Sequence, residues 1–324
     1  MMSIAVSVIN HNDAAATIEC LDSLLTQLVP ADRPFKLDIF IVDNASDTRD
    51  RRLLENRLPL PGSDNIHVAW LDRNLGFSAG HNRNIRDIFE GATPDFVWLL
   101  NNDCIVKADC AAHLVECATS SPQTAIWGAT LIEPDDATIQ CAGGCTYNTW
   151  ISSFRQLGHG TPLEKLSELQ RGDPDYIAGA SLFFPAPLVK TAFHPAHMEG
   201  ARRHDSAPLL LNEAFFLYFE ELDLAQRLKP EYDMRWCRQA KIVHSGGKAT
   251  GAKGRIRSAK AEYFSSLGAL IFTKTYFPNR LWIMMPARFI AKCIQLIFTG
   301  NVRFVRYVAR AYVDFIKKTT PPEL

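Results

Sequence analysis

Residues 96–103 read FVWLLNND, a run of five apolar residues followed by three polar ones. A short apolar run of this kind is typical of a strand that is buried on both faces of a parallel sheet. In open α/β sheets, ligands bind beyond the carboxyl ends of such strands. The stretch therefore predicts a central strand of an α/β fold with a ligand site at its end.

Around this stretch, short apolar runs alternate with segments of helical periodicity over roughly the first 130 residues. The other predicted strands are Ser3–Asn10, Leu37–Val42 and Ile66–Leu71. This alternation predicts a doubly wound, mostly parallel sheet. Asp13 can cap the first helix, whose apolar stripe consists of Ile18, Leu21, Leu24, Leu25 and Leu28.

The alternation becomes less regular after about residue 135. There we expect a surface loop over residues 158–173, strands at Tyr176–Phe184 and Met234–His244, and helices at Ala214–Leu228 and Ala259–Tyr276. The chain is thus predicted to have three parts, which are residues 1–132, residues 133–277 and a helical extension over residues 278–324.

The chain carries 35 basic and 35 acidic residues, so its overall charge offers no attraction for nucleic acid or another polyanion. Its eight cysteines show neither a CxxC pair nor the dense spacing of a disulfide scaffold, which favours a reducing cytoplasm. The N-terminus lacks the basic region and cleavage site of a signal peptide. No stretch reaches the ~18 uncharged apolar residues of a spanning helix, so we expect a protein that is soluble or lies on a membrane surface.

Polar residues follow each of the four strands predicted in the first part. Because the carboxyl ends of parallel strands meet at one edge of a sheet, these groups should converge on a single crevice. The groups are Asn10-His11-Asn12, Asp43-Asn44-Ala45-Ser46, Arg73-Asn74-Leu75-Gly76 and Asn101-Asn102-Asp103.

Two aspartates in these groups have chemistry that suits a phosphorylated ligand. Asp103 ends a buried strand, and its carboxylate could bind Mg²⁺ or Mn²⁺ together with phosphate oxygens. Asp43 could accept hydrogen bonds from a nucleobase N–H or from ribose hydroxyls. Taken alone, each is more readily explained as a turn residue, but their expected convergence favours a shared site.

Glu220, Glu221 and Asp223 follow a block of mostly aromatic residues in FFLYFEELDLAQRLK. Burial and mutual repulsion would favour the protonated form of a carboxylic acid here, and that shift suits a general base. Acids are also common in the solvated first turn of a helix, where they lie at the positive end of the dipole. Position alone does not decide between these interpretations.

His244 ends a predicted strand and precedes Ser245-Gly246-Gly247-Lys248. A lone histidine is most often structural, but the glycine pair permits close backbone approach and Lys248 adds a positive charge. A role for His244 near phosphate or metal is therefore plausible. The basic cluster that follows could steady a diphosphate or could be a solvated loop; it consists of Lys248, Lys253, Arg255 and Arg257.

Taken in order, the motifs resemble those of family 2 of the glycosyltransferases, which have the GT-A fold, and especially its rhamnosyltransferase-like bacterial branch. The resemblance implies a Rossmann-like nucleotide-sugar-binding half over residues 1–132 and an acceptor-binding, catalytic half over residues 133–277. The motifs span roughly residues 3–275 and are VSVINHN, IVDNASDT, NLGFSAGHNRNI, FVWLLNNDCIV, YIAGASLFF, FFLYFEELDLAQRL and AKIVHSGG.

The resemblance also implies roles for individual residues. Asp43 would bind the nucleoside, Asp103 would contact Mg²⁺ or Mn²⁺ as the last acid of a DxD-like motif, and His244 would lie near the metal and diphosphate. Glu221 would be the catalytic base, although the family usually has an aspartate there. Glu220 and Asp223 would bind the acceptor or support the site. The other residues predicted to bind the donor are Asn10, Asn44, Asn74, Asn82, Asn101, Asn102 and Lys248.

The implied reaction is a single displacement that moves a sugar from a nucleotide-sugar to a hydroxyl of a cell-surface polysaccharide or a lipid-linked glycan precursor. L-Rhamnose from dTDP-rhamnose is the donor expected from the branch, with UDP-GlcNAc or UDP-Gal as alternatives. A catalytically inactive glycan- or nucleotide-binding protein is the rival from another class, because both carboxylate motifs depart from the common pattern. A nicotinamide oxidoreductase is excluded, since INHNDA stands where G-x-G-x-x-G would be required.

The segment from about Pro286 to Lys318 predicts amphipathic helices. Basic and aromatic residues there suit an anionic membrane, so we expect a peripheral protein on the inner face of the cytoplasmic membrane. The helices could instead pack on the catalytic domain or form a homodimer. In a helix that starts near Pro286, one face holds Phe289, Ile290, Cys293, Ile294 and Ile297, and after Gly300 a basic stripe of Arg303, Arg306, Arg310 and Lys317 runs beside Val305, Val308, Tyr312, Phe315 and Ile316.

Overall fold

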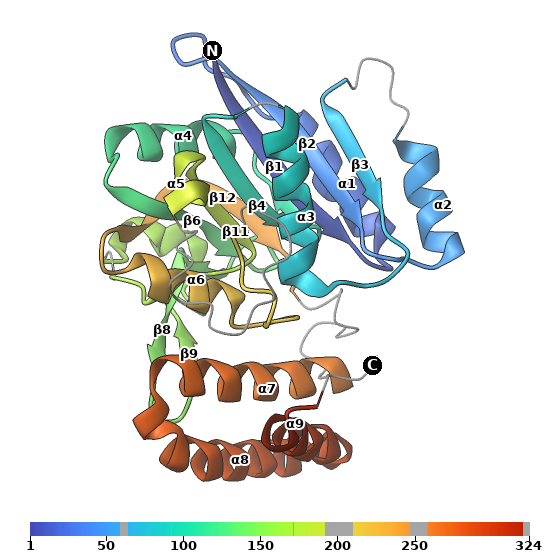
Figure 1. Ribbon diagram of the computed structural model, residues 1–324. Helices are drawn as coiled ribbons and strands as arrows, with labels where there is room; N and C mark the ends of the chain where they lie inside the picture. The colour runs from blue at the N-terminus through green and yellow to red at the C-terminus, as the bar shows by residue number, and fades with distance from the viewer. Residues whose placement is uncertain (59–63, 92, 171, 192–209, 247–257, 320–324) are drawn as a thin grey trace.

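A computed structural model describes residues 1–58, 64–91, 93–170, 172–191, 210–246 and 258–319 (Figure 1). One large sheet carries helices on both of its faces, and a separate helical layer formed by residues from 259 onward lies below it. The helices are α1 (Ala14–Leu25), α2 (Thr48–Arg57), α3 (Gly76–Gly91), α4 (Cys110–Ser120), α5 (Pro187–Thr191), α6 (Glu220–Leu228), α7 (Ala259–Tyr276), α8 (Leu281–Phe298) and α9 (Val305–Lys317).

The strands of the large sheet come from both halves of the chain. They are β1 (Met2–Asn10), β2 (Phe35–Asp43), β3 (Ile66–Trp70), β4 (Phe96–Asn101), β5 (Cys104–Val106), β6 (Thr124–Ile132), β7 (Ile139–Ala142), β11 (Ser181–Pro185) and β12 (Asp233–His244). Their order is β3-β2-β1-β4-β11-β6-β12-β5, with β7 paired to β6. A smaller sheet is formed by β8 (Gly144–Asn148), β9 (Ser153–Gln156) and β10 (Tyr176–Ile177).

The predicted α/β fold is confirmed, and its parallel part is the segment β3-β2-β1-β4. In the register of these strands, Asn10 lies opposite Asp43 and Ile9 lies opposite Asn101. The polar ends of the strands are therefore level with one another, as the sequence predicted. Beyond β4 the sheet is mixed, because β11 runs antiparallel between β4 and β6.

The pairing of β12 joins segments that are far apart in the sequence. Along β6, β12 is parallel, whereas along β5 it is antiparallel with His244 opposite Cys104. Cys117 of α4 and Cys237 of β12 form a disulfide, which the cysteine spacing did not predict. Because the sheet interleaves strands from residues 1–132 with strands from later residues, the boundary between the two predicted halves stays a prediction.

The helix predicted over Ala214–Leu228 is wrong in its first part, since α6 begins only at Glu220. Tyr218 and Phe219 have φ angles of 70° and 77°, which no α-helix accommodates. The α3 helix holds the segment in front of them. Phe77 N donates to Phe216 O at 2.7 Å, Ser78 Oγ donates to Phe215 O at 2.6 Å, and Asn82 bonds the backbone of Leu211 in both directions.

The helical layer consists of α7, α8 and α9, which contact one another. Its apolar contacts include Leu270 of α7, Met284 and Leu296 of α8, and Val308 and Tyr312 of α9, all of them buried. The predicted start near Pro286 is wrong, because α8 begins at Leu281 and holds Pro286 in its second turn.

We expect Gly76→Ala to destabilise the protein by roughly 2 kcal/mol or more, measured as the free energy of unfolding in urea. Gly76 has a φ of +83°, and an added Cβ would lie 2.5 Å from Phe216 O. The matched control is Gly91→Ala at the other end of α3, where an added Cβ would meet nothing within 4 Å. That variant should be neutral or slightly stabilising. Equal stability of both variants would show that α3 does not hold the segment before α6.

Candidate active site

A cleft of about 520 Å³ opens at the carboxyl edge of the parallel strands. Its lining combines the end of β4, the start of α6, the end of β12 and parts of α7 and α8. Of the residues predicted to bind the donor or the metal, to catalyse the reaction or to support the site, those that line the cleft are Asn44, Asn74, Asn101, Asn102, Asp103, Glu220, Glu221 and His244. The others are not among the lining residues of the described chain, and Lys248 lies outside the described residues.

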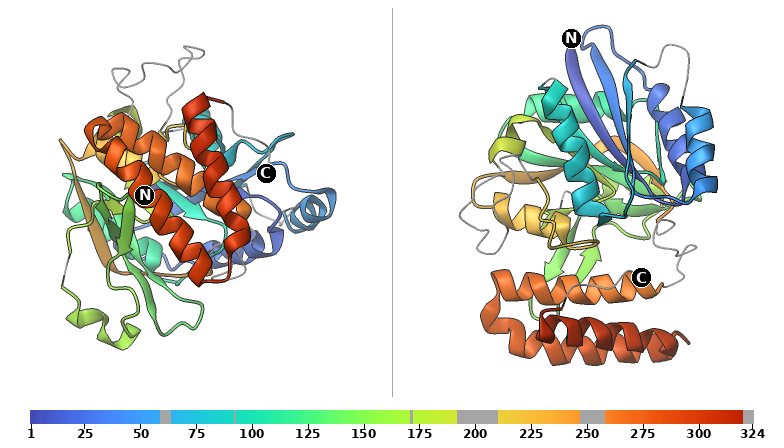
Figure 2. Two further views of the ribbon diagram at one scale, coloured as in Figure 1. Left: turned by 90° about the horizontal axis from the view of Figure 1, so that it is seen from below. Right: turned by 45° about the vertical axis from the view of Figure 1, so that its right-hand side comes forward.

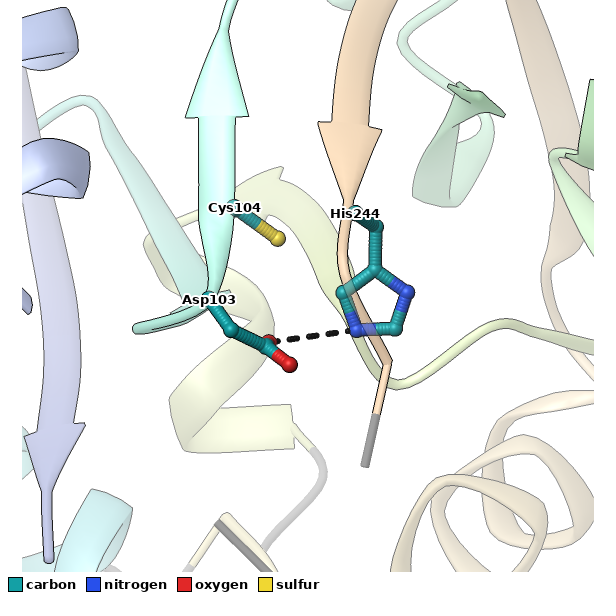
Figure 3. Close-up of side chains that lie close together, drawn as sticks. All are labelled: Asp103, Cys104 and His244. Atoms are coloured by element: carbon teal, nitrogen blue, oxygen red, sulfur yellow. Dashed lines mark ion pairs between the residues drawn. The ribbon is translucent and has the colours of Figure 1, made fainter. Parts of the chain in front are cut away.

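Asp103 and His244 face each other across the junction of β5 and β12 (Figure 3). The distance from His244 Nε2 to Asp103 Oδ1 is 3.2 Å, and their side chains are 13% and 4% exposed. Ser245 N also donates to Asp103 O at 3.0 Å. The strand pairing therefore fixes both residues at the rim of the cleft.

Gln140 of β7 orients the imidazole of His244. His244 Nδ1 lies 2.6 Å from Gln140 Oε1, so with this amide orientation Nδ1 donates to Gln140 and Nε2 is the nitrogen that faces Asp103. Gln140 Nε2 in turn donates to His244 O at 3.1 Å. A histidine ligand held by a hydrogen bond on its other nitrogen is common in metal sites. No motif in the sequence pointed to Gln140, because its role depends on the pairing of β7 with β6.

The donor set at this place fits a divalent cation. Asp103, Cys104 and His244 offer potential ligand atoms that all lie within 4.8 Å of one another. Burial raises the pKa of the Cys104 thiol, and the thiol contacts Ala180 O at 3.7 Å. A neutral thiol is a poor metal ligand, so Asp103 and His244 are the two residues of this group that suit a cation.

Glu220 and Glu221 begin α6 and face the cleft from another side. Burial raises the pKa of Glu221 to about 7, and burial together with the charge of Glu221 raises the pKa of Glu220. The Oε2 atom of each has no hydrogen-bond partner among the described residues. These carboxyl groups therefore differ from acids in a solvated first turn, and the chemistry of a general base becomes available at neutral pH.

The backbone before these glutamates is strained. Tyr218 and Phe219 both occupy the left-handed region, where a non-glycine residue costs of order 1–3 kcal/mol. Gly179 lies opposite, and a Cβ there would make only an ordinary contact of 3.5 Å with Glu221 Oε1. The strained turn is therefore the feature that sets the position of the Glu221 carboxyl group.

Asp223 is held entirely by structural partners. Its carboxylate accepts hydrogen bonds from Arg227 Nε at 2.9 Å, Tyr276 Oη at 2.8 Å and Asn212 Nδ2 at 3.3 Å. It is 1% exposed. These contacts tie α6 to α7, and the acceptor-binding or supporting role of Asp223 stays a prediction.

The residues predicted to bind the donor contact two different loops, Asn10 and Asp43 the loop after β2, and Asn44 and Asn74 the backbone of Gly76 at the start of α3. Asn10 Nδ2 donates to Asp43 Oδ2 at 2.8 Å, and Asp43 Oδ1 accepts from Ser46 N at 3.1 Å, so both side chains are engaged in shaping the loop after β2. Asn44 Nδ2 donates to Gly76 O at 3.1 Å, and Asn74 Oδ1 accepts from Gly76 N at 2.8 Å. No contact in the structure tests a donor-binding role for these residues, which stays a prediction.

The asparagines at the end of β4 point to different neighbours. Asn101 Nδ2 lies 3.3 Å from His244 Nε2, whereas Asn102 Nδ2 donates to Thr17 Oγ1 at 3.1 Å. His11, which belongs to the polar group predicted after the first strand, also lines the cleft, as does Lys260, which the sequence analysis did not single out. Burial lowers the pKa of His11, and the charge of Lys260, in the first turn of α7, lowers it further.

The model of the family described as Glycosyl transferase family 2 matches residues 4–141. The comparison with curated proteins gives no match. Among solved structures, GalNAc-T7 with UDP, GalNAc and Mn²⁺ is similar at a TM-score of 0.61 and 10% identity, over 86% of this chain and 49% of that chain. This chain therefore spans about half the length of GalNAc-T7.

Two further solved structures cover nearly all of this chain. The mannosyltransferase PcManGT from Pyrobaculum calidifontis, in complex with GDP-Man and Mn²⁺, has a TM-score of 0.55 at 12% identity over 98% of this chain and 88% of that chain. S. aureus TarS 1-349 with UDP-GlcNAc has a TM-score of 0.54 at 12% identity over 98% and 82% of the two chains. The fold is thus the GT-A fold of glycosyltransferases. Residues 4–141, which match the family 2 model, form part of this fold.

We expect Asp223→Asn to lower the free energy of unfolding by about 3–5 kcal/mol, because Arg227 would keep its buried charge without a carboxylate partner. The matched control is Asp233→Asn. Asp233 pairs with Arg235 at the surface, where its side chain is 63% exposed, and such a change should cost less than about 1 kcal/mol. Urea unfolding of both variants measures the difference. A stable Asp223→Asn variant that lacks only activity would assign Asp223 to the chemistry instead.

Proposed function

We propose that this protein is an inverting, metal-dependent glycosyltransferase that moves a sugar from a nucleoside diphosphate sugar to a hydroxyl of a cell-surface polysaccharide or a lipid-linked glycan precursor. The observation that carries the proposal is that the Asp103–His244 pair and the buried carboxyl group of Glu221 line one cleft. A pair that suits a cation and a base with a pKa near neutrality are the two requirements of this reaction.

In the proposed reaction, Glu221 accepts the proton of the acceptor hydroxyl while the acceptor oxygen bonds to the anomeric carbon. The bond from that carbon to the diphosphate breaks at the same time, and the nucleoside diphosphate leaves with the electron pair. Asp103 and His244 would hold a divalent cation, which would neutralise the charge that develops on the diphosphate. Attack from the opposite face inverts the anomeric carbon.

The donor is a matter for experiment, and dTDP-β-L-rhamnose, which would give an α-linked product, is the first to test. The proposal of rhamnose depends only on the resemblance of the sequence motifs to one bacterial branch. The similar solved structures were obtained with UDP and GalNAc, GDP-Man or UDP-GlcNAc, which supports a nucleotide-sugar donor in general. Thermal shift with each nucleotide-sugar in the presence of Mn²⁺ would identify the donor, since a ligand that binds only the folded state raises Tm.

We expect Asp103→Ala to abolish sugar transfer and to weaken the donor-induced rise in Tm chiefly when Mn²⁺ is present. Chelation of the wild type with EDTA should have the same effect, because the cation joins the carboxylate to the diphosphate. Asp136→Ala is a suitable control, since Asp136 is an exposed acid that pairs with Lys107 away from the cleft. Full transfer by the wild type in excess EDTA would contradict the metal assignment.

We expect the transfer rate to rise with pH on an apparent pKa near 7, because Glu221 must lose its proton to act as base. Glu221→Gln should lower kcat by about 10²–10⁴-fold and should abolish this rise of the rate with pH. A pKa raised by folding stabilises the protein below pH 4.5, and this contribution is lost as the pH rises through 7. Glu221→Gln should therefore be more stable than the wild type at pH 8 by on the order of 2–3 kcal/mol.

The control for this experiment is Glu55→Gln, an exposed acid on α2 that pairs with Arg51. It should change neither the pH profile nor the stability. If Glu220→Gln lost turnover while Glu221→Gln kept it, the base would be Glu220. A protein that binds nucleotide-sugars but releases no nucleoside diphosphate with any of them would be the inactive binding protein.

A further inference from the structure

The exposed face of α8 is apolar to an unusual degree. Its most exposed large side chains are Trp282, Ile290, Ile294, Ile297 and Phe298, which are 49–86% exposed. Ile290, Ile294 and Ile297 are three or four residues apart, Trp282 lies about two turns before Ile290, and Phe298 follows Ile297, so the five side chains share one side of the helix. Residues that are this apolar and this regularly exposed are uncommon on a protein that faces only water.

The charged residues of α8 point the other way. Arg288 donates to Ser152 O and to Ser265 O, and Lys292 donates to Glu262 Oε2 at 2.9 Å. Lys292 and Glu262 are only 18% and 4% exposed at their side chains. The helix therefore keeps its charges against the rest of the protein and turns its apolar side outward, the reverse of a surface helix in water.

The α9 helix and the short turn before it, Val302–Phe304, add positive charge to the same layer. Arg303, Arg306 and Arg310 are exposed, and exposed Val302, Val313 and Ile316 lie among them. Residues 278–319 contain eight basic residues and one acid, Asp314, which accepts a hydrogen bond from Tyr263 Oη at 2.9 Å. Seen from below, α8 and α9 together form the underside of the molecule (Figure 2).

Taken together, these features lead us to propose that the exposed faces of α8 and α9 dock on an anionic lipid bilayer, with α8 in the plane of the interface. Apolar side chains enter the boundary between head groups and acyl chains, while arginines contact acidic head groups. A second copy of the chain fits less well, because a symmetric dimer would bring the arginines of the two α9 helices toward each other.

The structure also favours an in-plane helix over a spanning one. The segment Pro278–Phe298 is long and apolar enough to cross a membrane by length and composition, with a mean hydropathy of 1.5. Only 17% of its most apolar 18-residue stretch is buried within the protein. This corrects the expectation that no such helix exists. A spanning orientation, however, would break the contacts of Arg288, Lys292, Met284 and Leu296 with the rest of the protein.

The docking surface lies close to the cleft. Lys260, Glu262 and Ser265 of α7 and Arg288 and Lys292 of α8 form part of the cleft lining. The two helices therefore form one wall of the cleft, and the opposite face of α8 is the one that we place against the bilayer. Since a helix with its side chains is about 10 Å across, the cleft would lie within one or two helix diameters of the lipid head groups. An acceptor carried by a lipid could reach it there.

The test is flotation of the full-length protein with vesicles of equal parts phosphatidylcholine and phosphatidylglycerol, compared with phosphatidylcholine alone. We expect the wild type to float with the anionic vesicles and less with the neutral ones. The triple variant Ile290→Gln, Ile294→Gln, Ile297→Gln should bind on the order of a hundredfold more weakly. Arg303→Gln and Arg306→Gln should each weaken binding to anionic vesicles about fivefold.

The matched control is Leu53→Gln, which removes a similarly exposed apolar side chain from α2, on another side of the molecule. It should float like the wild type. Nucleotide-induced thermal shifts of all variants report whether they remain folded. Equal flotation of the triple variant and the wild type would overturn the proposal. The proposal would also be overturned if the wild type did not float but formed a dimer that the triple variant lost. If alkaline carbonate failed to extract the wild type from the vesicles, α8 would span the membrane instead.

Discussion

The antiparallel pairing of β5 with β12 is the constraint on which the candidate site depends. It places His244 opposite Cys104 and bonds Ser245 N to Asp103 O, so two residues 141 positions apart meet at 3.2 Å. The backbone hydrogen bonds of the two strands hold the carboxylate and the imidazole together, so the side chains need no direct bond to keep this position. The neighbouring strand β7 then supplies Gln140, which selects the nitrogen that faces Asp103.

Glu220 and Glu221 are kept in place at a cost in stability. Their carboxyl groups are buried with unsatisfied oxygens, and the two residues before them are held in the left-handed region. Such strain persists only where the surrounding structure compensates for it. The compensation comes from the hydrogen bonds of α3 to residues 211–216, which hold the segment before α6, and from the partners of Asp223, which hold its first turn. The burial that lowers the stability of the folded protein also raises the pKa of Glu221 to about 7, so this carboxyl group can take up a proton near neutral pH.

Much of this arrangement was predictable from residues at strand ends. The run Phe96–Asp103 and the three apolar runs before it predicted the parallel sheet with its strand ends level, because both features depend on local periodicity and on the geometry common to all such sheets. The irregular path of residues 214–219 was missed, since bonds from α3, distant in sequence, override a local helical pattern. Gln140 and Lys260 were missed for a similar reason: neither belongs to a motif, and only tertiary pairing brings them to the cleft.

The position of β12 within the large sheet has a consequence for how the chain acquires its structure during synthesis. This strand lies between β6 and β5, and β5 has no other partner in the described sheet. When the nascent chain has emerged as far as β6, the edges of β5 and β6 that pair with β12 therefore lack hydrogen bonds until residue 244 follows, more than a hundred residues later. Unpaired edges of this kind invite association between chains. The ribosome-bound intermediate is the form of this protein that we expect to need a chaperone most.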